Sequence, residues 1–216
     1  MTVPMNVSHD EFIALRHIQP FDADIIRLQI CDQLKKQPDT RDELFEKRKR
    51  RYDDTIQYAL DEAAGKDIPR QEVIDRTVHS LNAEMGVAYI LGGVWGVFDW
   101  LDNDNITFDV PTPGFNLEIK TSFAKWPTMH TAGAKPYGKS EGLCLYSGLR
   151  GDADVYLVFN INEYAGRTTY SPNYFFTKRA MENYPYVICA PKRGGGAYIN
   201  RQHNKFVYFY NKWCTS

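Results

Sequence analysis

The pattern of hydrophobic and polar positions divides the chain into a helical part and a part made of strands. Over roughly the first 90 residues, apolar side chains recur every three or four positions, the spacing that places them on one face of a helix. Capping residues mark four expected helices. The first opens at Ser8, the second runs from Asp22 through Leu34, the third from Thr40 through Ala64, and the fourth from near Pro69 to Gly92-Gly93. Glu84 borders the apolar stripe of the fourth helix, so its carboxylate needs a partner.

From residue 106 the apolar positions alternate with a period of two, which predicts strands. Ile106–Val110 and Asn116–Thr121 form a predicted hairpin around a turn at Pro111–Gly114. Ala153–Ile161 is almost continuously apolar, as expected of a strand at the centre of a sheet. The remaining expected elements are a short helix at Phe175–Asn183 and strands at Tyr186–Ala190, Ala197–Asn200 and Phe206–Tyr210, the last two paired as a hairpin.

These elements predict an α/β protein in which a mixed β-sheet core is flanked by helices. Residues 1–68 are expected to form a helical N-terminal region, and residues 69–216 the core with a basic C-terminal elaboration. The longest apolar stretch, Gly86–Phe98, is interrupted by glycines and is too short to span a bilayer. The N-terminus has no secretory pattern, and the four cysteines lie far apart, so we expect a cytoplasmic protein with reduced thiols.

The net charge of −1 hides an asymmetry along the chain. Residues 1–118 hold 22 acidic and 13 Lys/Arg side chains, whereas residues 119–216 hold 5 acidic and 13 Lys/Arg side chains. The basic half suits a polyanionic partner, although the two halves could also pack against each other. The basic run Lys47–Arg51 has two interpretations as well, because it could contact phosphates or form a solvated helix face with i,i+4 partners such as Glu43.

Two carboxylates and a lysine are the strongest candidate for catalytic chemistry. Glu118 and Lys120 share one face of the second predicted strand, and Asp109 lies on the strand paired with it. Two carboxylates on rigid strands suit Mg²⁺, with Mn²⁺ as a substitute, and such a metal lowers the pKa of a bound water. Lys120 can orient or deprotonate that water and hold a phosphate.

The spacing Asp109-x8-Glu118-Ile119-Lys120 resembles the D-(x)n-E-x-K signature of the PD-(D/E)XK nuclease superfamily. The resemblance covers roughly residues 70–165 and implies a restriction-endonuclease-like fold. It implies that Asp109 and Glu118 are metal ligands, with the Ile119 carbonyl as a further ligand, and that Lys120 is the catalytic lysine. It also implies Glu84 as an auxiliary ligand. Phe108 stands where the signature often has proline.

Basic residues in glycine-rich segments are the predicted DNA contacts. The long loop Phe123–Gly142 follows the catalytic strand and could lie along a phosphate backbone, or simply connect two elements. The predicted contacts in this loop and in the C-terminal segments are Lys125, Lys135, Lys139, Lys192, Arg193, Arg201 and Lys205.

The sequence therefore predicts a Mg²⁺-dependent DNA endonuclease, encoded by a prokaryote or a phage, that cuts double-stranded DNA at specific sites. A structure-selective repair or recombination nuclease is the alternative within this class, and a non-catalytic nucleic-acid-binding module of the same fold lies outside it. A third hypothesis is an unrelated α/β protein with a chance E-x-K motif. Restriction-type enzymes often act as dimers, which makes a homodimer a further expectation.

Overall fold

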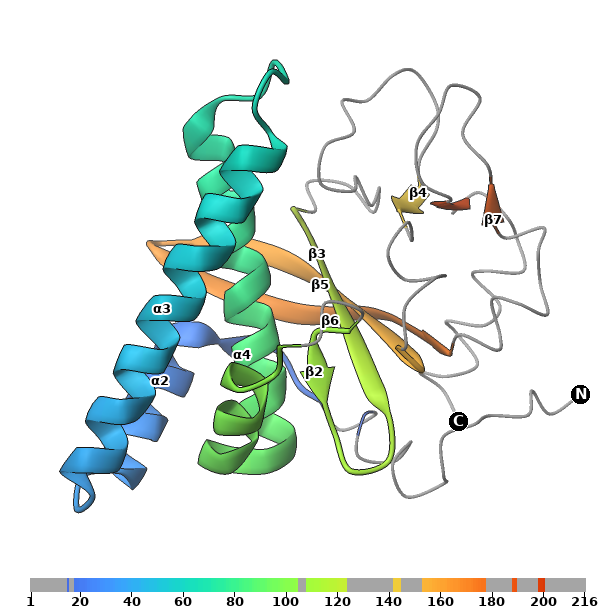
Figure 1. Ribbon diagram of the computed structural model, residues 1–216. Helices are drawn as coiled ribbons and strands as arrows, with labels where there is room; N and C mark the ends of the chain where they lie inside the picture. Colours follow the sequence, from blue (N-terminus) through green and yellow to red (C-terminus); the bar gives the residue numbers. More distant parts are fainter. Residues whose placement is uncertain are drawn as a thin grey trace, which may run out of the picture.

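A computed structural model of the protein describes Leu15 and residues 18–104, 108–123, 142–144, 153–177, 188–189 and 198–200. Three helices lie beside a five-stranded sheet, with α4 between α3 and the sheet (Figure 1). The helices are α2 (Ala23–Gln33), α3 (Pro38–Glu62) and α4 (Arg70–Leu101). The predicted α/β class, with helices first and a mixed sheet after them, is confirmed.

The helix starts follow the local chemistry of the chain. Asp22 caps α2 as predicted, because its carboxylate accepts a hydrogen bond from the backbone N–H of Asp24 at 2.8 Å. The expected start of α3 at Thr40 is wrong, since the helix begins at Pro38, whose fixed φ suits the first turn. The helix expected from Ser8 lies outside the described residues except for Leu15.

Helix α4 turns back on itself at Gly93. The backbone of Gly93 has φ 61° and ψ −150°, a conformation that glycine alone adopts readily. The indole of Trp100 reaches the carboxylate of Glu84 at 3.0 Å, although in a straight helix residues 16 apart would be separated by about 24 Å. Residues 94–101 therefore pack against the preceding turns of α4. The predicted helix end at Gly92-Gly93 marks this break, but the sequence did not indicate that a helix resumes after it.

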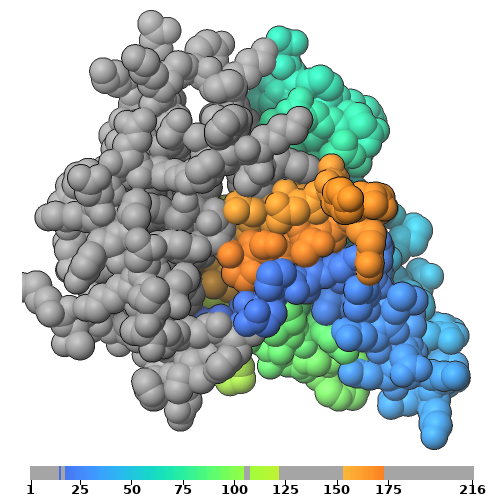
Figure 2. Space-filling view, turned by 180° about the vertical axis from the view of Figure 1, so that it is seen from behind, coloured from blue at the N-terminus to red at the C-terminus, as the bar shows by residue number. Residues whose placement is uncertain are grey.

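The five-stranded sheet has the order β1-β6-β5-β3-β2. Its strands are β1 (Phe21–Asp22), β2 (Val110–Pro111), β3 (Asn116–Phe123), β5 (Val155–Tyr164) and β6 (Arg167–Thr177). The predicted central position of the apolar strand is confirmed, because β5 lies between β3, to which it is parallel, and β6, to which it is antiparallel. Seen from behind, the β5–β6 hairpin lies next to α2 (Figure 2).

Strand β6 corrects one prediction. Residues 175–177, assigned to a short helix, form the end of this strand, which pairs with β5 across a turn at Ala165 and Gly166. Pro172 lies within β6, next to a shift in register between Val158 and Phe159, and a proline inside a run argues against a strand. The proline is therefore accommodated by a local irregularity in the pairing.

A second sheet contains β4 (Gly142–Cys144), β8 (Tyr198–Asn200) and β7 (Ile188–Cys189), in that order. Strands β7 and β8 fall within two predicted strands. The third, Phe206–Tyr210, and hence its hairpin with β8, lies outside the described residues.

The hydrophobic core fills the space between the helices and one face of the large sheet. Leu117 and Ile119 of β3 join this core together with alternate residues of β5 and buried residues of α4. The division of the chain at residue 69 stays a prediction. Strand β1, which precedes that boundary, pairs with β6, which follows it. Helix α4 is long and apolar enough to cross a membrane by length and composition, but 61% of its most apolar window is buried, as in a core helix.

Candidate active site

Asp109 stands at the start of the β2–β3 hairpin, one residue before β2. The structure places it in a bend and not in the strand that was predicted for it, because the antiparallel pairing begins at Val110, opposite Leu117. The backbone N–H of Asp109 donates to the carbonyl of Leu117 at 2.8 Å. One carboxylate oxygen of Asp109 accepts a hydrogen bond from the backbone N–H of Ile119 at 2.6 Å. These two bonds fix the side chain against β3.

Glu118 and Lys120 lie on the face of β3 opposite to Leu117 and Ile119, as the period of two predicted. The Glu118 side chain is only 5% exposed, and the Lys120 ammonium forms an ion pair with its carboxylate. Tyr156 and Val158 of β5 are their register partners and are also buried. The E-x-K pair is thus a partly buried ion pair on a central strand. This burial of Glu118 is unlike that of an ion pair on a solvated surface.

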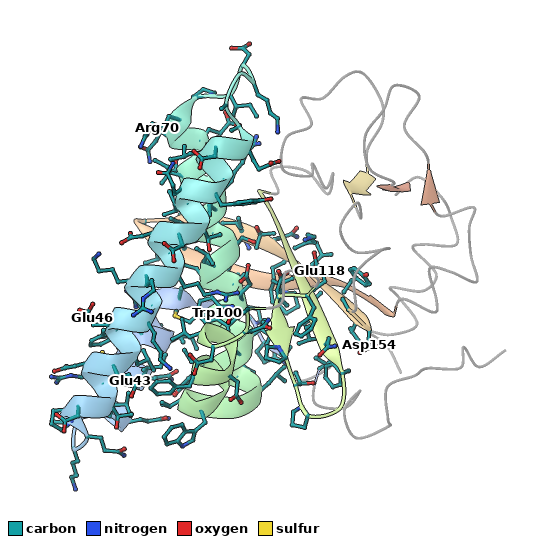
Figure 3. The ribbon with its side chains drawn as sticks, in the orientation of Figure 1. Glu43, Glu46, Arg70, Trp100, Glu118 and Asp154 are labelled. Atoms are coloured by element: carbon teal, nitrogen blue, oxygen red, sulfur yellow. The ribbon has the colours of Figure 1, made fainter. Side chains whose placement is uncertain are left out.

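Glu84 approaches the same place from α4. Its side chain is 8% exposed, and one of its carboxylate oxygens accepts a hydrogen bond from the indole N–H of Trp100 at 3.0 Å. The same oxygen lies 3.8 Å from the guanidinium of Arg51, which in turn lies over the Trp100 ring at 4.9 Å. The predicted need of Glu84 for a partner is met by Trp100 and Arg51. Figure 3 shows Trp100 on the helical side of the molecule and Glu118 on β3.

Electrostatics link these groups into one cluster. Burial raises the pKa of Asp109 well above its usual value, and the carboxylates of Glu84 and Glu118 raise it further, against the opposing effect of Lys120. Burial also raises the pKa of Glu84, while Arg51, Trp100 and Lys120 lower it. Burial lowers the pKa of Lys120, but the carboxylates of Asp109, Glu118 and Glu84 outweigh that effect and raise it overall. The ionisation of Glu84, Asp109 and Lys120 therefore depends on one shared set of neighbouring charges.

The contacts of the acids bear on whether this cluster could hold a metal. In the part of the chain that the structure describes, no three His, Cys, Asp or Glu side chains are arranged to hold a metal ion. One oxygen of Asp109 faces the Ile119 N–H, and one oxygen of Glu118 faces Lys120. A complete set of carboxylate ligands is therefore not formed in this arrangement.

The chemistry of the donors nevertheless fits a hard divalent cation. Carboxylate and carbonyl oxygens are the ligands that Mg²⁺ takes in proteins. The N–H and C=O of one strand residue point to the same side, so the Ile119 carbonyl faces the strand edge where its N–H meets Asp109. The cluster contains three acids and two cationic side chains, Arg51 and Lys120, and an added cation would offset the remaining negative charge.

The basic run on α3 is mostly engaged with the protein itself. Lys47 pairs with Glu43 at 3.3 Å, as predicted, and with Asp102 at 2.7 Å, whereas Lys49 pairs with Asp53 at 2.9 Å. Figure 3 shows Glu43 on the part of α3 that lies away from the sheet. The interpretation as a helix face held by ion pairs is therefore favoured for these two lysines. The predicted DNA contacts Lys125, Lys135, Lys139, Lys192, Arg193, Arg201 and Lys205 all lie outside the described residues.

Arg51 and Trp100 are two residues of the cluster that the sequence did not indicate. Arg51 is the last residue of a charged run whose spacing suggested a solvated face, and its contact with Glu84 is long-range. Trp100 lies in the part of α4 after Gly93, which was not predicted to be helical. The one signal in the sequence was Glu84 itself, because a carboxylate beside the apolar stripe of a helix needs a partner.

The comparisons with known proteins bear on the chemistry of this cluster. The sequence model of the family described as Bacteriophage T4 endonuclease IV matches residues 5–201, which is most of the chain. The matched region contains Glu84, Asp109, Glu118 and Lys120. Neither a curated protein nor a solved structure matches the chain.

Proposed function

The chain belongs to the bacteriophage T4 endonuclease IV family, which makes it a DNA endonuclease, and from this premise we propose that the cluster around Asp109 and Glu118 is its active site. The proposal assigns the site to the PD-(D/E)XK type, with a Mg²⁺ or Mn²⁺ ion as cofactor. The observation that carries it is the convergence of three buried carboxyl groups on Lys120 where helix α4 meets the β2–β3 hairpin. Glu118 pairs with Lys120, Asp109 is held against β3 by the Ile119 N–H, and the carboxylates of Asp109, Glu118 and Glu84 all raise the pKa of Lys120.

Each side chain has a distinct role in this proposal. Asp109 and Glu118 would hold the metal together with the Ile119 carbonyl, and Glu84 would act as an auxiliary ligand. The bound metal would supply an acidified water and would neutralise charge on the scissile phosphate. The hydrogen bond from Ile119 N–H fixes the orientation of one oxygen of Asp109.

Lys120 acts as a cation in this mechanism. Because the surrounding carboxylates raise its pKa, its ammonium keeps its proton at neutral pH. A protonated lysine can bind a phosphate oxygen and stabilise the negative charge that grows as the phosphodiester is cut. It cannot accept a proton in that state, so of the two predicted roles of Lys120 the structure favours phosphate binding over water deprotonation.

The family supports DNA as the substrate, and the finer predictions concern how it is recognised and cut. Double-stranded, site-specific cleavage and a homodimer remain predictions, as do the seven basic DNA contacts named above. The expected prokaryotic or phage origin agrees with a family named after a phage enzyme.

Cleavage assays with metal controls test the proposed site. Purified protein is incubated with supercoiled plasmid and with circular single-stranded phage DNA, in Mg²⁺, Mn²⁺, Ca²⁺ or EDTA. We expect cleavage by the wild type in Mg²⁺ and Mn²⁺, none in EDTA, and none by Glu118→Ala. Undiminished cleavage in EDTA or by Glu118→Ala would refute the proposed metal site.

The same assay tests the predicted substrate form. Discrete fragments from the plasmid would support site-specific duplex cleavage. Cleavage confined to the single-stranded circle would contradict that prediction while leaving the metal site intact.

A further inference from the structure

Arg51 of α3 contacts the acidic cluster through most of its guanidinium group. Its Nη2 atom lies 3.8 Å from the carboxylate of Glu84, and its plane covers the Trp100 ring at 4.9 Å from the centroid. Its Nη1 atom donates a hydrogen bond to the backbone carbonyl of Asn103 at 2.9 Å. Three separate contacts thus orient this side chain.

Asn103 extends these contacts to the other side of the cluster. Its side-chain amide donates to the carbonyls of Phe108 and Asp109, at 3.3 and 3.4 Å. These carbonyls belong to the short segment that turns the Asp109 carboxylate toward the Ile119 N–H. Arg51 therefore contacts Glu84 directly and the backbone at Asp109 through Asn103.

The guanidinium group of Arg51 is buried without all of its hydrogen-bond donors being satisfied. Its Nε atom is buried and has no hydrogen-bond partner among the described residues, and an unpaired buried donor typically costs about 1–3 kcal/mol. Lys47 and Lys49, earlier on the same helix, pair with acids at the surface. Because this unpaired donor reduces the stability of the fold, the burial of Arg51 calls for another explanation.

We propose that Arg51 is a positioning residue of the active site, which fixes Glu84 and the backbone at Asp109 relative to each other. The inference rests on the metal centre proposed above and adds a residue outside the E-x-K motif to it. Arg51 acts through these two neighbours and needs no contact with DNA. Residues that orient metal ligands commonly change metal affinity about 10–100-fold when they are replaced.

Substitution by lysine separates position from charge. Arg51→Lys keeps the positive charge near Glu84, but a lysine lacks the planar fork that reaches Asn103 and Glu84 at the same time. Arg48→Lys is the matched control, because Arg48 lies on the same helix and also covers an aromatic ring, that of Tyr52, at 5.6 Å. Any loss that follows only from exchanging a stacked arginine should be seen in both variants.

The test is Mn²⁺ binding, measured by the electron paramagnetic resonance signal of the free ion, with no DNA present. We expect Arg51→Lys to weaken binding about tenfold or more, whereas Arg48→Lys binds like the wild type. Asn103→Ala should also weaken binding, and combining it with Arg51→Lys should have less effect than the two separate losses predict. Circular dichroism checks that each variant is folded.

Two results would overturn the inference while leaving the proposed function in place. One is wild-type affinity in Arg51→Lys, and the other is an equal loss in Arg48→Lys. If the wild type does not bind Mn²⁺, or if Asp109→Asn binds it equally well, the proposed metal centre itself fails and the inference fails with it. The wild type and Asp109→Asn therefore distinguish the two kinds of failure.

Discussion

Replacing Asp109 by asparagine should abolish metal-dependent stabilisation without weakening the metal-free protein. An asparagine oxygen can accept the same hydrogen bond from the Ile119 N–H, which is worth about 1 kcal/mol. The substitution also removes a carboxyl group whose pKa is raised by burial and by Glu84 and Glu118, so its charged form is unfavourable in the metal-free protein. We therefore expect the melting temperature of Asp109→Asn in EDTA to be equal to or higher than that of the wild type.

The magnitude of the metal effect follows from linkage. Once the site is saturated, each tenfold rise in free Mg²⁺ adds about 1.4 kcal/mol to the free energy of unfolding of a protein that binds it only when folded. In a protein of 216 residues this corresponds to about 3–6 °C in melting temperature. The wild type should show this slope, measured by differential scanning fluorimetry at constant ionic strength, and Asp109→Asn should show little or none.

Asp154, the residue before β5, provides a matched control at the first residue of β3. Its carboxylate accepts a hydrogen bond from the backbone N–H of Asn116 at 3.0 Å, so Asp154→Asn makes the same chemical change in another side chain that accepts from the backbone of β3. Figure 3 shows Asp154 apart from Glu118. Asp154→Asn should keep the wild-type slope with Mg²⁺. A wild-type slope in Asp109→Asn would refute the assignment of Asp109 as a ligand.

Three further predictions concern catalysis, the turn in α4 and pH. Lys120→Ala should abolish cleavage yet retain DNA binding in Ca²⁺. Cleavage assays and mobility shifts measure the two, and either residual cleavage or a loss of binding would contradict the prediction. Gly93→Ala should lower the free energy of unfolding by about 1–3 kcal/mol because Gly93 has a positive φ. Gly92→Ala, at a helical position, should raise it by up to about 1 kcal/mol. Equal effects of the two substitutions in urea melts would contradict the turn at Gly93. Burial lowers the pKa of His79, opposed by Glu163 and Asp75, so the protonated form favours unfolding and stability should fall as the pH drops below about 6.5. His79→Gln should lose less stability over this range in urea melts at stepped pH, and an equal loss would show that other groups dominate.

The parts of the fold that follow from local periodicity could be predicted from the sequence. The alternation in Asn116–Thr121 predicted that Glu118 and Lys120 share a face, and the apolar run Ala153–Ile161 predicted a central strand. Both features are patterns of neighbouring residues: an alternation with a period of two in one strand and a continuous apolar run in the other.

The parts that depend on distant contacts could not be predicted in this way. Arg51 appeared to belong to a solvated face because its spacing matched helical ion pairs, and its contact with Trp100 depends on how α4 turns back at Gly93. Strand β6 was not predicted, and local signals for it are weak, since it contains Pro172 and the turn at Ala165-Gly166 lacks a strong hairpin signal. In both cases tertiary packing outweighed the local pattern.

The turn at Gly93 also bears on the order in which the molecule assembles. It brings Glu84 and Trp100 together across 16 residues, whereas the first backbone hydrogen bond between the β3 and β5 segments, from Asp154 N–H to the carbonyl of Asn116, joins residues 38 apart. Because closing a longer loop loses more chain entropy, local helical contacts form sooner than parallel strand pairing. We therefore expect the α4 hairpin to be protected early in refolding and β3 to dock later. The acids on the two elements would then meet at a late step, so a partly folded chain would be unable to cut DNA.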